Sequence, residues 1–248
     1  MANGFDPRAT ASPQPTARTT GVGRDTAAFD AGLRSYMLSV YNYMASGVLL
    51  TGIVALLFAN SGYAAAILGG PGILKYVIIF APLAFVMVLS FGINRLSTGT
   101  AQLLFWLFAT VMGLSMASIF LVFTGESIAM TFFATAAGFA GLSLWGYTTK
   151  KDLSGFGTFL IMGVVGLLVA MIINMFVQSS ALQLAISFIG VLLFAGLTEY
   201  DTQRIKSLYF HVAGTDMMGK TVIMGALSLY LDFVNMFTFL LNFMGSRE

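Results

Sequence analysis

Several residue types on which enzymes and metal sites depend are missing or rare in this sequence. None of its 248 residues is cysteine, which excludes disulfides, thiolate metal sites and thiol nucleophiles. His211 is the single histidine and falls in a polar connection, so a metal site built from histidines is not expected. Only 9% of the residues are charged, and the formal net charge of +2 comes from scattered basic residues, which argues against nucleic-acid binding. We therefore expect no cofactor and no nucleic-acid partner.

Apolar residues are abundant instead. They make up 58% of the chain, whose mean hydropathy of +0.88 is not reached by a domain with a water-exposed surface. A bilayer-spanning helix needs about 20 apolar residues, and such runs cover residues 35–59, 75–93, 101–123, 127–147, 156–177, 181–203 and 221–244. Because the runs are continuous and do not alternate with polar residues, they predict helices and not the strands of a membrane barrel. The fold class is therefore an all-α polytopic membrane protein with seven transmembrane helices.

The beginning of the chain has a different composition. Residues 1–32 are rich in Thr, Ala, Ser and Pro and contain no apolar core segment, which predicts a disordered polar tail. A secretory signal peptide would need an apolar segment in this region, so none is expected. We expect residues 33–248 to form a single membrane domain.

Basic residues are distributed unequally between the two ends of the expected helices. Ten of the twelve fall in the tail or in the second, fourth and sixth connections: Arg8, Arg18, Arg24, Arg34, Arg95, Lys150, Lys151, Arg204, Lys206 and Lys220. The other side has only Lys75 and Arg247. Because loops rich in Lys and Arg stay in the cytoplasm, the amino terminus is predicted to be cytoplasmic and the carboxyl terminus to lie outside.

Asp232 lies inside the seventh apolar run, where an ionisable group costs about 2.5 to 3.5 kcal/mol on insertion scales. Such a residue is a functional-site candidate by default. A second acid, Asp201, lies at the end of the sixth run, near the predicted cytoplasmic face. Asp232 is 11 residues beyond residue 221, or roughly 16 Å along a helix and close to the midplane. The two depths agree better if the sixth helix continues beyond Lys206, which the helical spacing of the apolar residues up to Val212 permits.

Two carboxylates that face each other in a membrane cannot both ionise cheaply. If Asp201 and Asp232 meet, we expect them to share a proton, which would hold the two helices together through a hydrogen bond. When ionised, the pair would repel itself, admit water and offer transient oxygen ligands to Ca²⁺. In the alternative, each acid is satisfied separately, Asp232 by a Ser, Asn or Tyr on a neighbouring helix and Asp201 by Arg204. The sequence leaves both arrangements open.

Three other polar residues are associated with the expected acid pair. Arg95 is a candidate counter-ion that holds the pair in a closed state, with an ordinary positive-inside anchor as the alternative. Ser228 and Asn235 lie four residues before and three residues after Asp232, so the three form one polar stripe on the seventh helix. Because such a stripe faces protein or water, it predicts that this helix is interior.

Two features of the fourth run are expected to be structural. Glu126 is predicted to cap the outer end of the fourth helix, where a carboxylate favours the positive end of the helix dipole; an outer cation funnel is the alternative. The small-residue pairs Ala134/Gly138 and Ala137/Gly141 predict close packing against another helix.

Acids on two consecutive transmembrane helices are also what an intramembrane aspartyl protease requires. The dipeptide Tyr200-Asp201 resembles part of that motif. The other half of the motif is Gly-x-Gly-Asp, and this chain has Leu229-Tyr-Leu-Asp232, whose bulky residues would block an extended substrate. We therefore expect that the protein is not an enzyme.

Three segments together resemble the Bax inhibitor family of transmembrane proteins in its bacterial form. They are the stretches Phe133–Ser154, Thr198-Glu-Tyr-Asp-Thr-Gln-Arg-Ile205 and Ala226-Leu-Ser-Leu-Tyr-Leu-Asp-Phe-Val-Asn235. The resemblance implies six helices around a central seventh, in a bacterial plasma (inner) membrane. It also implies a pH-sensitive calcium leak, whose sensing acids correspond to Asp201 and Asp232, with Arg95 as the arginine that contacts them in the closed form.

The same resemblance supplies a second hypothesis. Some bacterial relatives bind and modulate a membrane-bound quality-control protease, so this chain would be a non-conducting regulator whose tail contacts that partner. The expected partners are thus the lipid bilayer, Ca²⁺ and protons, with the protease as the alternative.

Overall fold

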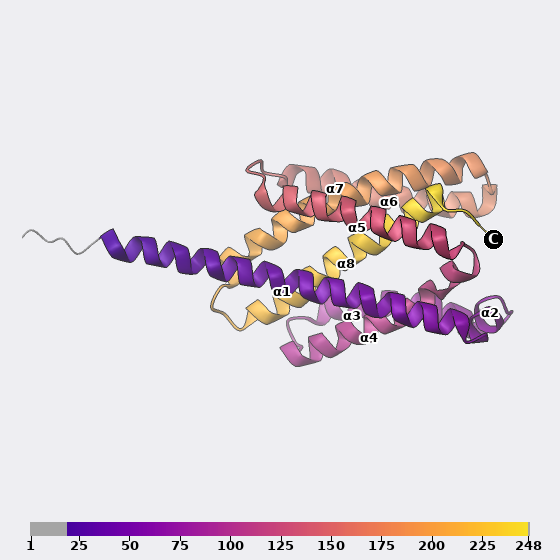
Figure 1. Cartoon of the computed structure of the whole chain (residues 1–248), viewed down its shortest axis with the longest axis horizontal. Coiled ribbons are helices and arrows are strands. Elements are labelled where there is room, and N and C mark those ends of the chain that lie inside the picture. Colours follow the sequence, from indigo (N-terminus) through magenta and orange to yellow (C-terminus); the bar gives the residue numbers. More distant parts are fainter. Residues whose placement is uncertain (1–18, 248) are drawn as a thin grey trace, which may run out of the picture.

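The structure is a computed structural model that describes residues 19–247, with side chains described from residue 29 onward (Figure 1). Its helices are α1 (Thr19–Asn60), α2 (Tyr63–Leu68), α3 (Ile73–Gly92), α4 (Thr98–Met116), the 3-10 helix η1 (Ala117–Leu121), α5 (Gly125–Thr148), α6 (Ser154–Val177), α7 (Ser180–Val212) and α8 (Met217–Met244). Seven of these segments are long and apolar enough to cross a membrane: α1, α3, α4 with η1, α5, α6, α7 and α8. The prediction of an all-α protein with seven spans is confirmed.

Short polar residues set where several spans begin. Ser97 accepts a hydrogen bond from the Thr100 backbone amide at the start of α4, and Ser179 does the same for Leu182 at the start of α7. At the start of α5 the capping residue is Thr124, which accepts from the Ser127 amide, so the expected cap at Glu126 is wrong. Glu126 lies in the first turn, where its charge still favours the helix dipole.

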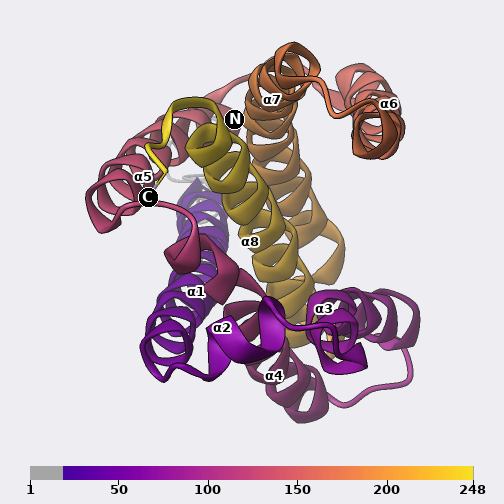
Figure 2. The same ribbon diagram turned by 90° about the vertical axis from the view of Figure 1, so that its right-hand side faces the viewer.

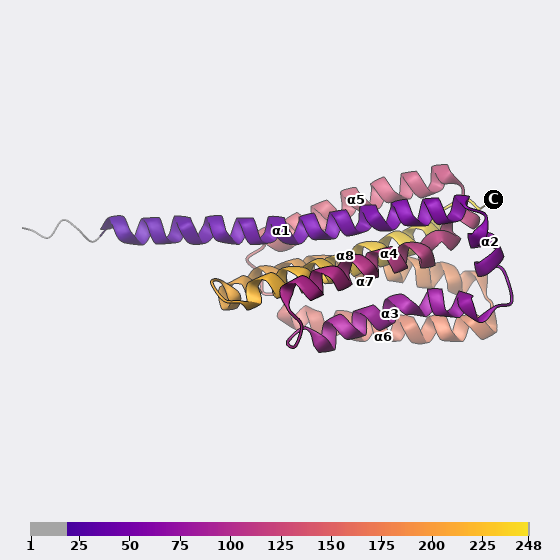
Figure 3. The same cartoon turned by 90° about the horizontal axis from the view of Figure 1, so that it is seen from below.

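Helix α1 begins earlier than the membrane domain was expected to begin. It starts at Thr19 and projects well beyond the other helices (Figures 1 and 3). No proline occurs between Pro15 and Pro71, and the apolar face of α1 continues upstream as far as Phe29, whose ring lies 5.1 Å from that of Tyr209. Residues 19–32 therefore extend the first helix, which differs from the expected tail. The rest of the expected tail, residues 1–18, lies outside the described part of the chain.

Helix α8 is by far the most buried span. Its most apolar part is 72% buried, against 11% to 28% in the other six spans. It packs mainly against α7, α1, α5 and α4, and Figure 2 shows it in the middle of the end-on view. Helices α3 and α6 take outer positions, where α3 packs on α4 and α6 packs on α7. The polar stripe thus lies on the helix with the least contact with lipid.

Helix α7 continues to Val212, well past Lys206. Its last turns are held by burial of Ile205 and Tyr209, and the Tyr209 ring lies 5.3 Å from that of Tyr36 on α1. This extension places Asp201 eleven residues before the end of the helix. It also places His211 in the last helical turn, exposed, and not in a connection as expected.

Close packing occurs at glycines other than the expected ones. Gly138 and Gly141 have open space where a side chain would go, and Ala134 and Ala137 are exposed, so the expected small-residue interface is wrong. The close approach is made by Gly146, where a Cβ would meet the backbone carbonyl of Glu199 on α7. Spacing identified small residues on α5 but not which face of the helix meets α7.

We expect Gly146→Ala and Gly141→Ala to change stability in opposite directions. The added methyl group at residue 146 would push α5 away from the α7 backbone, which should lower the free energy of unfolding by about 1 to 3 kcal/mol. At residue 141 the added methyl group displaces nothing, so the better helix propensity of alanine should raise the free energy of unfolding by about 0.5 to 1 kcal/mol. Reversible unfolding in mixed micelles measures both, and equal effects would contradict the close α5 to α7 contact.

Candidate functional site

Asp232 lies in the middle of the interior helix. Its side chain is only 4% exposed, between the fully buried Leu229 and Tyr230 and the buried Phe233. Within residues 29–247, its Oδ2 atom is buried and has no hydrogen-bond partner. The alternative in which a neighbouring Ser, Asn or Tyr satisfies this oxygen therefore finds no support. A buried carboxylate oxygen without a donor is unfavourable when charged, so the site favours a proton on this group.

Asp201 lies on α7 one helical turn away from the level of Asp232. Two contacts define the register of these antiparallel helices, because Gly225 faces Ile205 and Gly190 faces Phe239. Counting seven residues from the first contact places Asp232 opposite Thr198, three residues or about 4.5 Å along the helix from Asp201. Carboxyl groups one turn apart in level on neighbouring helices can interact electrostatically in a low-dielectric interior. The extension of α7 therefore reduces the difference in depth between the two acids to about one helical turn, which allows them to pair.

Among the described side chains, the cation that pairs with Asp201 is on its own helix. Arg204 Nη1 lies 3.9 Å from Asp201 Oδ1, and its side chain is 59% exposed, against 13% for the acid. An ion pair this open to solvent contributes about 0 to 1 kcal/mol. Arg95 lies exposed in the connection between α3 and α4, and the described residues contain no ion pair that involves it. Its role as a counter-ion remains a prediction.

The other two members of the polar stripe are half-buried. Asn235 donates from Nδ2 to the Leu231 carbonyl of its own helix at 2.8 Å, so its amide is used locally and does not reach Asp232. Ser228 lies one turn before Asp232 on the same face. The stripe thus places one polar residue about a turn before Asp232 and one about a turn after it, but within residues 29–247 its Oδ2 has no donor.

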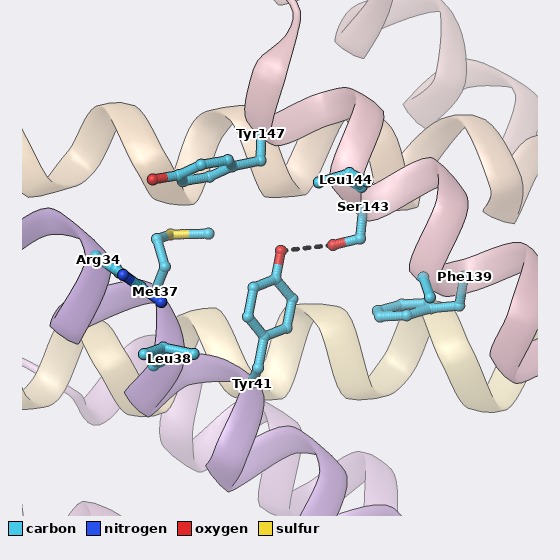
Figure 4. A pocket seen from close by; sticks show the side chains of 9 residues that line it. Arg34, Met37, Leu38, Tyr41, Phe139, Ser143, Leu144 and Tyr147 are labelled. Atoms are coloured by element: carbon cyan, nitrogen blue, oxygen red, sulfur yellow. Dashed lines mark hydrogen bonds between the residues drawn. The ribbon is translucent and has the colours of Figure 1, made fainter.

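A row of hydroxyl groups that the sequence analysis did not identify connects three helices near Asp201. The Tyr41 hydroxyl on α1 lies 2.5 Å from Ser143 Oγ on α5 (Figure 4). Ser143 Oγ in turn lies 3.0 Å from Thr202 Oγ1 on α7. Ser143 and Thr202 are buried, and Thr202 directly follows Asp201. Hydroxyl residues inside apolar runs were the available signal, but their pairing depends on which helices are neighbours.

Polar contacts surround the part of α7 that is expected to face the cytoplasm. Gln203 accepts from the Leu153 amide at 2.9 Å and donates to the Lys151 carbonyl at 2.7 Å, which ties α7 to the connection between α5 and α6. A pocket of about 280 Å³ lies here, lined by Lys151, Tyr200 and Arg204 among others. This pocket brings polar space to within one turn of Asp201.

The described side chains do not form a preformed metal centre. Among them, no group of three or more His, Asp or Glu residues is close enough to hold a metal ion. The prediction that Asp201 and Asp232 bind Ca²⁺ transiently therefore concerns two carboxylates and not a saturated coordination shell, which for calcium holds about six to eight oxygens.

Comparison with known proteins identifies the chain over almost its whole length. Residues 33–248 match the family model described as inhibitor of apoptosis-promoting Bax1. The chain is 45% identical over 220 residues to the inner membrane protein YbhL of Escherichia coli, which covers 88% of this chain and 94% of YbhL. It is also 45% identical over 244 residues to a protein of Caulobacter vibrioides, with 94% and 96% covered, and 45% identical over 223 residues to one of Rickettsia prowazekii, with 89% and 93% covered. The seven-span fold and these matches agree with the sequence resemblance, and the chain belongs to the Bax inhibitor family of multi-pass membrane proteins.

Proposed function

We propose that this protein is a pH-sensitive calcium leak channel gated by Asp201 and Asp232. The observation that carries the proposal is the buried Oδ2 atom of Asp232, which has no partner among the described residues and lies one turn from a second acid. An uncompensated acid in a membrane interior is costly, and natural proteins retain such groups mainly at functional sites. The resemblance to the family points to the same two residues.

In the closed state the two acids together hold a proton. The protonated pair lets α7 and α8 pack tightly, as at the Gly225 and Gly190 contacts. As pH rises and both acids ionise, their repulsion in a low-dielectric surrounding separates the helices and draws in water. The polar pocket beside Arg204 is the route by which water reaches Asp201 from the connection between α5 and α6.

Calcium flux into proteoliposomes tests this function. With the full-length protein, we expect Ca²⁺ entry to rise with pH, by about tenfold per pH unit below the midpoint because one ionisation controls the open state. The double variant Asp201→Asn/Asp232→Asn should show a flux that no longer depends on pH. Empty liposomes at each pH supply the background for the trapped calcium indicator. Folded wild-type protein that gives no flux above this background would contradict the leak.

A second candidate function rests on the shape of α1. Its first turns project beyond the other helices (Figure 3), where they are accessible to a membrane-bound partner such as a quality-control protease. Removal of residues 2–27 would test this hypothesis while it keeps Phe29 and its contact with Tyr209. A calcium leak should survive this truncation, whereas an effect that depends on the partner should be lost.

We also propose the location and orientation of the chain. YbhL is named an inner membrane protein, and we infer the same membrane here. The excess of basic residues beside the amino-terminal ends of α1 and α8 supports a cytoplasmic amino terminus and an outer carboxyl terminus. We expect no enzymatic activity, because Leu229 and Tyr230 fill the space that a peptide substrate would need beside Asp232.

A further inference from the structure

A pocket of about 470 Å³ lies between α1 and α5, at the end of the bundle where α5 finishes. Its lining includes Arg34, Leu38 and Tyr41 of α1 and Phe139, Leu144 and Tyr147 of α5. Figure 4 shows Arg34 and the Tyr147 hydroxyl toward one end of this lateral pocket and Phe139 toward the other. Its volume is within the range of about 300 to 1,000 Å³ that is typical of ligand sites.

No helix of the described chain covers the lateral pocket. Helices α1 and α5 both pack against α7 and α8 but do not pack extensively against each other. Leu38 and Leu144 at the rim are 51% and 64% exposed, and both belong to membrane-spanning segments. The pocket therefore opens sideways toward hydrocarbon, so its occupant enters from the lipid phase.

The two ends of the lateral pocket have different chemistry. Its body is apolar, whereas Arg34 supplies a cation that forms no ion pair with Asp30, one turn earlier, or with any other acid in residues 29–247. Tyr147 is the second-last residue of α5, and aromatic residues at a helix end are typical of the level of the lipid headgroups. The Lys206 ammonium adds positive charge here, because it donates to the Tyr147 carbonyl at 2.7 Å.

We propose that the lateral pocket binds an anionic phospholipid, with one acyl chain between α1 and α5 and the phosphate on the Arg34 guanidinium. Arginine suits this role because its planar fork donates two hydrogen bonds to a phosphate and stays charged at all physiological pH values. The apolar body accepts a chain that lies parallel to the two helices. This site is separate from the acid pair and does not depend on the proposed leak.

The test uses full-length protein in phosphatidylcholine nanodiscs with a trace of phosphatidylglycerol that carries a diazirine in one acyl chain. Photolabelling should concentrate on peptides that contain Leu38 and Leu144, and unlabelled phosphatidylglycerol should compete while extra phosphatidylcholine and soluble glycerol phosphate do not. Arg34→Gln should lower the apparent affinity for phosphatidylglycerol about tenfold, as expected for loss of a charge-assisted hydrogen bond. Lys75→Gln, which removes a cation at the start of α3, should leave it unchanged.

A second pair of variants tests the apolar half of the site. Ala140→Phe should fill the lateral pocket and reduce labelling, whereas Ala137→Phe places the same ring on an exposed position of α5 outside it. Labelling spread evenly over all lipid-facing helices, or equal competition by phosphatidylcholine, would overturn the proposal. Because the chain has no cysteine, disulfide-linked dimers of Ala140→Cys would show that a second copy covers this face and would equally overturn it.

Discussion

Replacing Asp232 alone with asparagine is expected to remove the pH dependence of calcium flux as completely as the double replacement does. Asparagine keeps the size of the side chain but cannot ionise, so the buried position on α8 would no longer gain charge as pH rises. Asp201 would then have no acid opposite it, and its ion pair with Arg204 lets it stay charged without forcing the helices apart. Measurement of the flux in proteoliposomes across a pH series distinguishes control by Asp232 from a pH response that many groups share equally.

Arg204→Gln should shift the pH response without abolishing it. The cation 3.9 Å from Asp201 favours the charged carboxylate, so its removal should move the midpoint of the flux to higher pH. The shift should be less than about one pH unit, because the arginine is largely exposed.

Asp152 provides the matched control for both substitutions. It lies in the connection between α5 and α6, where hydrogen bonds from the side chain and backbone of Ser154 lower its pKa below the ordinary value. The carboxylate therefore stays charged throughout the assay. Because Asp152 lines the polar pocket beside Arg204, Asp152→Asn should change only the level of the flux and leave the pH of half-maximal flux in place. An unchanged pH profile in Asp232→Asn would show that Asp232 is not part of the gate.

Tyr230→Ala is expected to cause the largest loss of stability in the bundle. The side chain is fully buried where α8 meets α1 and α4, with its ring 5.1 Å from that of Phe108. Its hydroxyl lies 2.6 Å from Thr51 Oγ1, which donates to the Ala109 carbonyl at 2.8 Å. Because lipid is as apolar as the protein interior, the loss comes mainly from packing and hydrogen bonding, and we expect about 3 kcal/mol in the free energy of unfolding.

Two further tyrosine variants separate the causes of that loss. Tyr230→Phe keeps the ring and removes the hydroxyl, which should cost about 0.6 kcal/mol and at most about 1.7 kcal/mol, the average and the maximum for hydrogen bonds between membrane helices. Tyr63→Ala truncates a tyrosine that is 69% exposed at the start of α2 and should change little. These values come from reversible unfolding in mixed micelles. A loss at Tyr63 equal to that at Tyr230 would show that α8 is not the packing centre.

Much of the fold follows from local features of the sequence. A segment in a bilayer must satisfy its own backbone hydrogen bonds, so an apolar run of sufficient length is enough to predict a helix. All seven spans were found in this way, and the boundaries that moved, at Thr19 and Val212, are where helices extend beyond the apolar runs. The interior position of α8 was also predictable, because Asp232 and Asn235 place polar atoms on one of its faces.

The sequence by itself therefore determined the fold class, the number of spans and the two candidate acids. Only the tertiary structure decided that Asp201 lies one turn from Asp232, that Gly146 and not Gly138 meets a neighbouring helix, and that Tyr41, Ser143 and Thr202 form one row. It also decided that α3 and α6 take outer positions and that a pocket separates α1 from α5. The physical reason is that lipid is as apolar as the protein interior, so hydrophobicity marks which segments cross the membrane but not which face of each helix meets another helix.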